Sequence, residues 1–266
     1  MLVNYHLHSC CSFDADHPLT EMCRAAAAAG VGALCLTDHC DLVDEKGQPD
    51  DSFDWAAEDQ ELAAARAAFP DMEICRGVEL GEAILRPEAA QRVLSEPGID
   101  FVLGSMHNTP QGMDYYWIEY TSRAQCLRLA EEYLQCLLKL SQTDYFDSLA
   151  HLTYPLRYMR DKAGFPIDFR PFDDLVQEIL KTLVQRGKAL ELNTSGYLGP
   201  QKEPHPPEYI LRRYRDLGGE LITIGSDAHV PEHAAQGLEQ GTELLRQCGF
   251  SYITQYKNRK PLQKRI

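Results

Sequence analysis

The stretch Leu2-Val3-Asn4-Tyr5-His6-Leu7-His8 decides the fold prediction for this chain. It opens with a short apolar run typical of a buried strand. In an open, doubly wound α/β sheet, a glycine-rich phosphate loop usually follows the first strand, whereas here a His-x-His pair stands at that position. Because side chains alternate along a strand with period two, both imidazoles would point to one face. The stretch therefore predicts a strand whose end presents two metal-type ligands.

Short apolar runs alternate with longer amphipathic segments along the rest of the chain. We expect strands at Leu2–Tyr5, Ala33–Thr37, Glu73–Leu80, Phe101–Ser105, Asp147–Ala150, Lys188–Leu192 and Leu221–Gly225, with a further short candidate at Phe250–Gln255. We expect helices at Leu19–Ala29, Trp55–Phe69, Pro87–Leu94, Ser122–Ser141, Phe172–Arg186, Pro207–Leu217 and His233–Gln247. This alternation predicts parallel βα units closed into a single-domain (β/α) barrel, with the loops Gly47–Asp54 and Gly199–Pro207 over one end.

Length, composition and charge narrow the classes of function. The chain has 266 residues, of which 44% are hydrophobic, enough for a substantial core. It carries 26 basic and 40 acidic side chains and a formal charge of −14, which argues against nucleic-acid and membrane partners. No apolar run approaches the roughly 20 residues that span a bilayer, and no basic-then-apolar leader opens the chain. We therefore expect a cytoplasmic protein, and the sequence makes no prediction about its oligomeric state.

The nine cysteines fit that compartment. Their number is odd and no Cys-x-x-Cys occurs, so neither a disulfide framework nor the usual cysteine zinc spacing is indicated. Cys35 and Cys75 lie in strand-like runs and are expected in the core. Cys10, Cys11 and Cys40 lie near histidine motifs, where we expect them to pack rather than to bind metal.

Histidines and selected carboxylates follow the expected strands. Six of the nine histidines lie at strand ends, namely His6, His8, His39, His107, His151 and His229. Glu79 closes the third strand and Asp227 precedes His229 by two residues, whereas the sixth strand ends in Glu191-Leu192-Asn193. The carboxyl ends of strands in a closed parallel barrel meet at one mouth, which is where such barrels build active sites.

The joint pattern carries more weight than any one of its parts. A lone His-x-His is more often structural than metallic, and Asp38 beside His39 could serve only to fix an imidazole tautomer. Ligand-type residues at almost every strand end nevertheless predict a metal centre. His17, His205 and His233 fall outside the pattern, and for them we expect surface or capping roles.

This order of motifs resembles the polymerase and histidinol phosphatase (PHP) family. His-x-His, an acidic residue, Asp-His, Glu, His, His and Asp-x-His follow one another along essentially the whole chain. The resemblance implies that residues 1–266 form one PHP-type metal-dependent phosphoesterase domain, a distorted (β/α)7 barrel with three divalent ions. Zinc, iron and manganese all suit such ligands.

The resemblance also implies which residues hold which ion. His6, His8, Glu79 and Asp227 would bind the first, and Glu79 would bridge to a second completed by His107 and His151. Asp14, His39 and His229 would bind the third, with Asp16 and His17 as nearby competitors for the place of Asp14. Three divalent ions against three carboxylates leave the cluster positively charged, which would attract a phosphate dianion.

The reaction implied is hydrolysis of a phosphomonoester. Arg157, Arg160 and Asn193 are the expected substrate-binding residues, although either arginine could equally be a surface residue at a helix start. Arg157 would stabilise charge on the phosphate, and Asp14 or His229 would give a proton to the leaving group.

Within the family the chain is most similar to the histidinol-phosphate phosphatases, which implies L-histidinol phosphate as substrate in histidine biosynthesis. The segments 191–196, 210–219 and 222–229 carry this similarity. Glu82, Asp114 and Glu119 could form an acidic rim for the cationic amine of that substrate, or be ordinary solvated carboxylates.

Three alternatives remain open at the level of sequence. The barrel could act on another small phosphomonoester or on nucleic acid, although no basic groove supports a nuclease. An amidohydrolase would place a metal-bridging lysine after a middle strand, and no expected strand end carries one. The third alternative is a metal-binding module without catalysis.

Overall fold

Seven parallel strands form an almost closed barrel in this computed structural model, which describes residues 1–266 apart from the side chain of Asp161. Their order is β1 (Leu2–Asn4), β2 (Val31–Leu36), β4 (Glu73–Gly81), β5 (Phe101–Ser105), β6 (Ser148–Leu149), β7 (Ala189–Asn193) and β8 (Ile222–Gly225). The last strand returns to the first, since Tyr5 N donates to Ile224 O at 2.8 Å and Leu7 forms a parallel bridge with Ala228. The predicted (β/α)7 barrel is confirmed.

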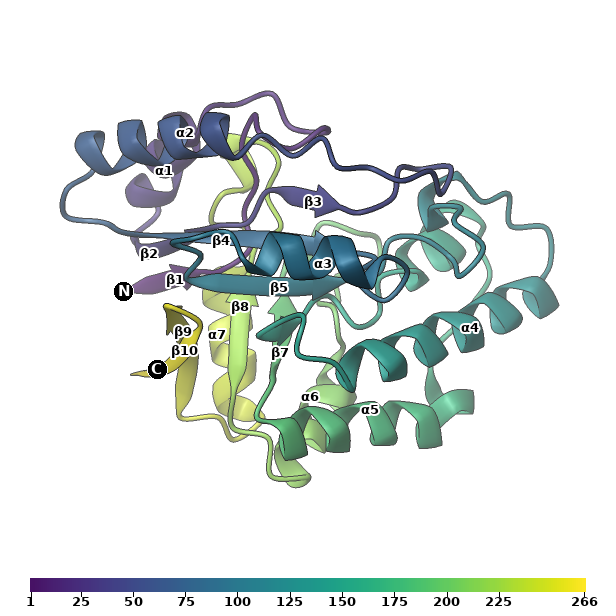
Figure 1. Cartoon of the computed structure of the whole chain (residues 1–266). Coiled ribbons are helices and arrows are strands. Elements are labelled where there is room, and N and C mark those ends of the chain that lie inside the picture. The colour runs from purple at the N-terminus through teal and green to yellow at the C-terminus, as the bar shows by residue number, and fades with distance from the viewer.

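Helices cover the outside of the barrel (Figure 1). They are α1 (Leu19–Ala28), α2 (Trp55–Ala68), α3 (Pro87–Leu94), α4 (Arg123–Ser141), α5 (Asp173–Arg186), α6 (Glu208–Asp216) and α7 (Leu238–Gln247). In α4 the buried positions Leu129, Tyr133 and Leu137 recur four residues apart, so one face of the helix packs on the barrel. Ser122 caps this helix by accepting from Gln125 N at 3.2 Å.

One short strand was not expected separately. β3 (His39–Asp41) follows a break after β2 and pairs in parallel with the carboxyl-terminal part of β4. The nine residues of β4 are long enough to pair with β2 first and with β3 afterwards. In this register His39 lies opposite Glu79, which brings the second histidine motif to the barrel mouth.

The chain end differs in two respects from the sequence prediction. The last helix begins at Leu238 and not at His233, because Gly237 has a left-handed φ of 70° that interrupts the helical path. The strand expected at 250–255 is β9 (Tyr252–Lys257), which pairs antiparallel with β10 (Lys260–Arg265) outside the barrel. This hairpin lies near the N-terminus (Figure 1).

The hairpin covers the end of the barrel opposite the mouth. Arg259 Nε donates to Asp147 Oδ2 at 2.9 Å, and Lys257 Nζ lies 3.0 Å from Asp100 Oδ2; both carboxylates directly precede barrel strands. Tyr256 packs on Phe101 with ring centroids 5.1 Å apart, at the edge of the buried core. Among the described residues, no helix has the length and apolar character needed to cross a membrane.

Candidate metal centre

The expected ligands converge at the mouth of the barrel, although they span positions 6 to 229 of the chain. A glycine in β8 leaves space for one of these side chains. An ideal Cβ added to Gly225 would lie 2.1 Å from His6 Cβ, so only glycine lets β8 approach β1 at this point. Any larger residue would push the first histidine out of the cluster.

His6, His8, Glu79 and Asp227 form one compact group of donor atoms. The Nε2 atoms of His6 and His8 are 3.1 Å apart. Asp227 Oδ1 lies 3.4 Å from His6 Nε2 and 3.3 Å from His8 Nε2, and Glu79 Oε2 lies 3.2 Å from His6 Nε2. Four donor atoms that face one another at these distances could surround a single cation.

Glu79 connects this group to a second one. Its other oxygen, Oε1, lies 2.9 Å from His151 Nε2 and 3.2 Å from His107 Nε2. The two imidazole nitrogens are themselves 3.4 Å apart. One carboxylate therefore presents its two oxygens to two separate pairs of histidines, which is the geometry expected of a ligand that bridges two ions.

Asp14, His39 and His229 meet on the open side of the cluster. Asp14 Oδ2 is 3.2 Å from His229 Nε2 and 3.7 Å from His39 Nε2. The ring of His8 stacks on His229 with centroids 4.0 Å apart. His39 also turns its Nδ1 toward Glu79 Oε2 at 3.2 Å, so it lies between this group and the bridging carboxylate.

The residues present fit a bound cation cluster. Among the described side chains, His39 Nδ1 and His229 Nε2 are buried and make no hydrogen bond. Six imidazoles with nitrogens turned toward one another and three carboxylates form a donor set that suits zinc, iron or manganese. Within the described part of the chain, the groups with ligand geometry consist of histidines and carboxylates.

A second layer of polar groups orients the imidazoles. Glu191 accepts from His6 Nδ1 at 2.6 Å and from His151 N at 2.6 Å. Asp41 lies 3.3 Å from His107 Nδ1. Ser12 Oγ lies 3.0 Å from His8 Nδ1 and donates to Asp38, which therefore acts on His8 through a serine. Such partners fix the tautomer that leaves the opposite nitrogen free for a metal.

Sequence reasoning missed Glu191 and Asp41 as functional residues. The sixth strand had appeared to lack a ligand, whereas Glu191 on that strand holds His6 and His151 from behind. The sequence did contain a signal for Glu191, since a glutamate inside a short apolar strand needs a buried hydrogen-bond partner. Asp41 follows His39 by two residues and so shares a strand face with it.

Burial and neighbouring charges set the protonation of the cluster. Burial and the adjacent His229 and His39 lower the pKa of His8 to about 3, which keeps its imidazole neutral. Burial opposes ionisation of Glu79, but the surrounding imidazoles outweigh it and hold its pKa well below the ordinary value. His8 is therefore neutral and Glu79 ionised, the forms in which these two residues would bind metal.

The expected substrate residues lie beside Asp227. Arg157 Nη2 donates to Ser195 Oγ at 2.8 Å and lies 3.5 Å from Asp227 Oδ2. Asn193 is buried and donates to Asp227 Oδ2 at 3.2 Å. Its contact with substrate stays a prediction, since the structure shows it as a support for Asp227.

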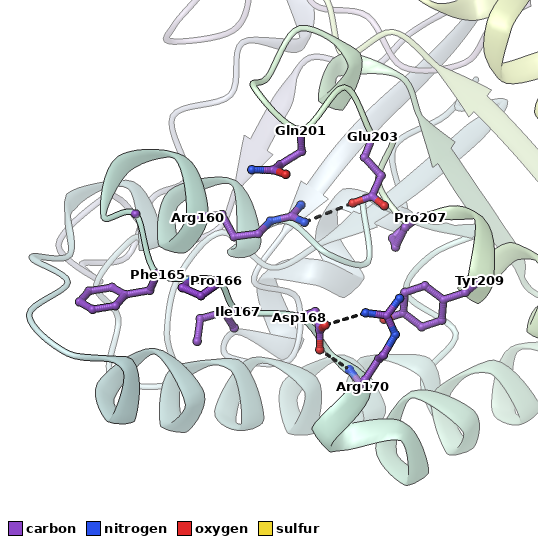
Figure 2. Close-up of a pocket in the computed structure, with 11 residues that line it drawn as sticks. Arg160, Phe165, Pro166, Ile167, Asp168, Arg170, Gln201, Glu203, Pro207 and Tyr209 are labelled. Carbon is purple, nitrogen blue, oxygen red and sulfur yellow. Dashed lines mark hydrogen bonds and ion pairs between the residues drawn. The ribbon is translucent and has the colours of Figure 1, made fainter.

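Arg160 lies on a π-helical turn, Arg157–Lys162, between two pockets. The inner pocket has about 410 Å³ and reaches Asp227. The outer pocket has about 400 Å³, and Figure 2 shows Arg160 turned toward Glu203 at its wall. The Arg160 Nη1 to Glu203 Oε2 distance is 3.2 Å.

Several residues lie elsewhere than sequence reasoning placed them. His205 is not a surface residue but is 3% exposed, because its backbone pairs with Asn193 at the barrel mouth. Glu82 is not part of a rim; it is buried and accepts from the backbone N of His107 and Asn108. Burial and the nearby Asp41 raise its pKa to about 8.

The structure also places the other histidines and acidic residues that the sequence analysis expected at the surface or around the substrate. The His17 side chain is 38% exposed and its Nδ1 lies 3.0 Å from Glu21 Oε2, as expected of a residue near the surface. Asp114 lines a cavity beside His39, whereas Glu119 is exposed and outside it. His233 is half-buried in a short turn before α7.

Comparison with known proteins shows the family to which this chain belongs. The family model of the PHP domain matches residues 4–195, and the chain belongs to this family. The match ends before Asp227 and His229, which the structure nevertheless brings to the same mouth.

Two relatives and one crystal structure are similar to this chain over nearly its whole length. A probable histidinol-phosphatase of Thermotoga maritima is 31% identical, covering 95% of this chain and 94% of that protein. The histidinol-phosphatase of Lactococcus lactis is 28% identical over 97% and 95% of the two chains. A crystal structure of histidinol phosphate phosphatase from Lactococcus lactis with zinc, L-histidinol and phosphate has a TM-score of 0.82 at 26% identity, covering 98% of each chain.

Proposed function

We propose that this chain is a metal-dependent phosphomonoesterase that hydrolyses L-histidinol phosphate to L-histidinol and phosphate in histidine biosynthesis. The observation that carries the proposal is the convergence of six imidazoles and three carboxylates on one barrel mouth beside Arg157. The similarity to a phosphatase solved with zinc, L-histidinol and phosphate, over 98% of the chain, supports the choice of substrate.

Three ions would occupy the cluster. His6, His8, Glu79 and Asp227 would hold the first; Glu79, His107 and His151 the second; and Asp14, His39 and His229 the third. The two-sided contacts of Glu79 support the division between the first two. Zinc, iron and manganese all fit this donor set.

Bound ions would supply Lewis acidity for the phosphate and activate water for attack on it. The chain itself contributes the surroundings. Arg157, held between Ser195 and Asp227, can turn two N–H donors to the phosphate and offset charge that develops on it. Asp14 or His229, on the open side of the cluster, would pass a proton to the leaving alkoxide.

A separate cavity suits the cationic part of the substrate. It has about 670 Å³ and begins at His39. Its walls are acidic and aromatic and carry Asp44, Glu45, Asp50, Asp54 and Asp114 together with Phe13, Phe53 and Trp117. Carboxylates and aromatic faces favour an ammonium or imidazolium group. The phosphate would then lie toward Arg157 and the amine toward Asp114.

We include residues 1–266 in one functional domain, since the loop after β8 supplies Asp227 and His229 beyond the family match. We place the protein in the cytoplasm, which agrees with its free cysteine thiols. Its partner is a small phosphate ester.

The decisive experiment is a phosphate-release screen on purified protein with metal quantification of the same sample. L-histidinol phosphate would be compared with nucleotides and sugar phosphates. We expect preferential turnover of histidinol phosphate and about three ions per chain. Turnover of another monoester alone would move the function to a different substrate. A folded protein that binds metal but releases phosphate from none of these esters would favour the metal-binding module without catalysis.

A further inference from the structure

His205 is a buried histidine that the proposed metal sites leave unused. It lies in the segment between β7 and α6, and it lines the inner pocket together with Arg157, Arg160 and Asp227. Its backbone is fixed on both sides, since His205 N donates to Asn193 O at 2.9 Å and Asn193 N donates to His205 O at 2.8 Å. The ring therefore has a defined place at the mouth.

One nitrogen of the His205 ring has a hydrogen-bond partner within the protein. His205 Nδ1 lies 2.8 Å from Thr153 Oγ1, in the loop after β6. Among the described residues, the ring makes no other hydrogen bond, so Nε2 has no protein partner there. Nε2 lies at the pocket wall, where an ideal Cβ on Gly196 would be 3.1 Å away.

The charges around His205 select its neutral form. Burial, Arg157, His151 and Arg160 hold the pKa of His205 well below its ordinary value, with Asp227 as the opposing charge. A neutral imidazole carries one proton. When the Thr153 hydroxyl donates to Nδ1, that proton is on Nε2 and points into a pocket that already contains two guanidinium groups.

We propose that His205 is a phosphate-binding residue, whose Nε2–H donates to a phosphate oxygen next to Arg157 and Arg160, and that the Thr153 hydroxyl donates to Nδ1 and so leaves the ring proton on Nε2. The inference rests on the proposed function insofar as the ligand is a phosphate. A neutral donor adds a directed hydrogen bond without adding to the positive charge of the ions and arginines. Thr153 is a positioning residue and acts only through His205.

The test uses inorganic phosphate as the probe and the zinc-loaded protein as the receptor. Binding is measured by titration calorimetry and zinc content is measured on each sample. We expect His205→Ala to weaken phosphate binding about tenfold to a hundredfold with zinc content unchanged, as expected for loss of a hydrogen bond to a charged group. His205→Gln places an amide N–H near the position of Nε2 and should restore most of the affinity.

Variants of Thr153 provide a second test that does not depend on the folding of His205→Ala. Thr153→Val keeps the shape without the hydroxyl and should weaken phosphate binding by about threefold to tenfold, whereas Thr153→Ser should bind like the wild type. His17→Ala removes an exposed histidine and is the matched control. Wild-type phosphate affinity in zinc-loaded His205→Ala, or in Thr153→Val when His205→Ala is unfolded, would overturn the inference.

Failure of the proposed function would be seen separately. A wild-type protein that releases no phosphate from L-histidinol phosphate contradicts the assigned substrate, but the calorimetric comparison still tests His205. A wild-type protein that hydrolyses L-histidinol phosphate while His205→Ala binds phosphate normally contradicts the role of His205 alone.

Discussion

Glu191→Gln is the substitution that best separates the orientation of ligands from ligation itself. Glu191 contributes no ligand atom to the proposed sites, but both of its oxygens accept hydrogen bonds, from His6 Nδ1 and from His151 N at 2.6 Å each. The side chain is 1% exposed, so water cannot replace either partner.

Glutamine has the same shape but only one acceptor oxygen. If its NH2 group faced His151 N, two donors would meet. If it faced His6 Nδ1, the imidazole would have to place its proton on Nε2, the nitrogen needed for the ion. Loss of such a partner typically lowers metal affinity tenfold to a hundredfold, or about 1.4 to 2.8 kcal/mol.

The assay is competition for zinc between the protein and a chelator of known affinity, followed by counting of retained ions. We expect Glu191→Gln to lose the ion at His6 first and to remain folded, with an unchanged far-ultraviolet spectrum. Glu243→Gln, at an exposed position of α7, is the matched control and should retain wild-type affinity. Equal zinc affinity in Glu191→Gln and wild type would refute the argument that Glu191 sets the tautomer of His6.

Three further predictions concern the bridge, the phosphate site and the core. Glu79→Ala should lose two ions in elemental analysis and lower turnover by orders of magnitude, because its two oxygens face two groups of histidines; full activity would contradict the bridge. Arg157→Ala should weaken competitive inhibition by phosphate about tenfold or more at unchanged metal content, and loss of the metal instead would contradict its assignment to phosphate. Burial raises the pKa of Glu58 to about 7 from 4.5 despite its bond to Arg76. Because the pKa of Glu58 is higher in the folded than in the unfolded chain, protonation of Glu58 stabilises the fold. This contribution to the free energy of unfolding, on the order of 3 kcal/mol, is complete below about pH 4.5 and is lost as the pH rises through about 7. The melting temperature of Glu58→Gln relative to wild type should therefore increase over this range, whereas that of Glu243→Gln, at the exposed position of α7, should stay constant; a constant difference for Glu58→Gln would contradict the raised pKa.

The barrel and the candidate ligands could be predicted from sequence patterns alone. Strands and helices of this length are local features, since apolar periodicity reflects burial of one face. The histidine and carboxylate motifs at strand ends could likewise be recognised locally, and parallel closure implies that all strand ends share a mouth. His6, Glu79 and His229 could therefore be brought together before any coordinate was known.

The polar groups that support those ligands could not be predicted in this way. Glu191 supports His6 across 185 positions of sequence, and Thr153 contacts His205 across 52. Such pairs depend on strand register and on how β8 closes against β1, and neither is encoded in the spacing of motifs along one segment. Glu82 and His205 look like surface residues in the sequence, because loops are usually exposed. They are buried because these loops fold back over the barrel mouth, and burial then decides their charge.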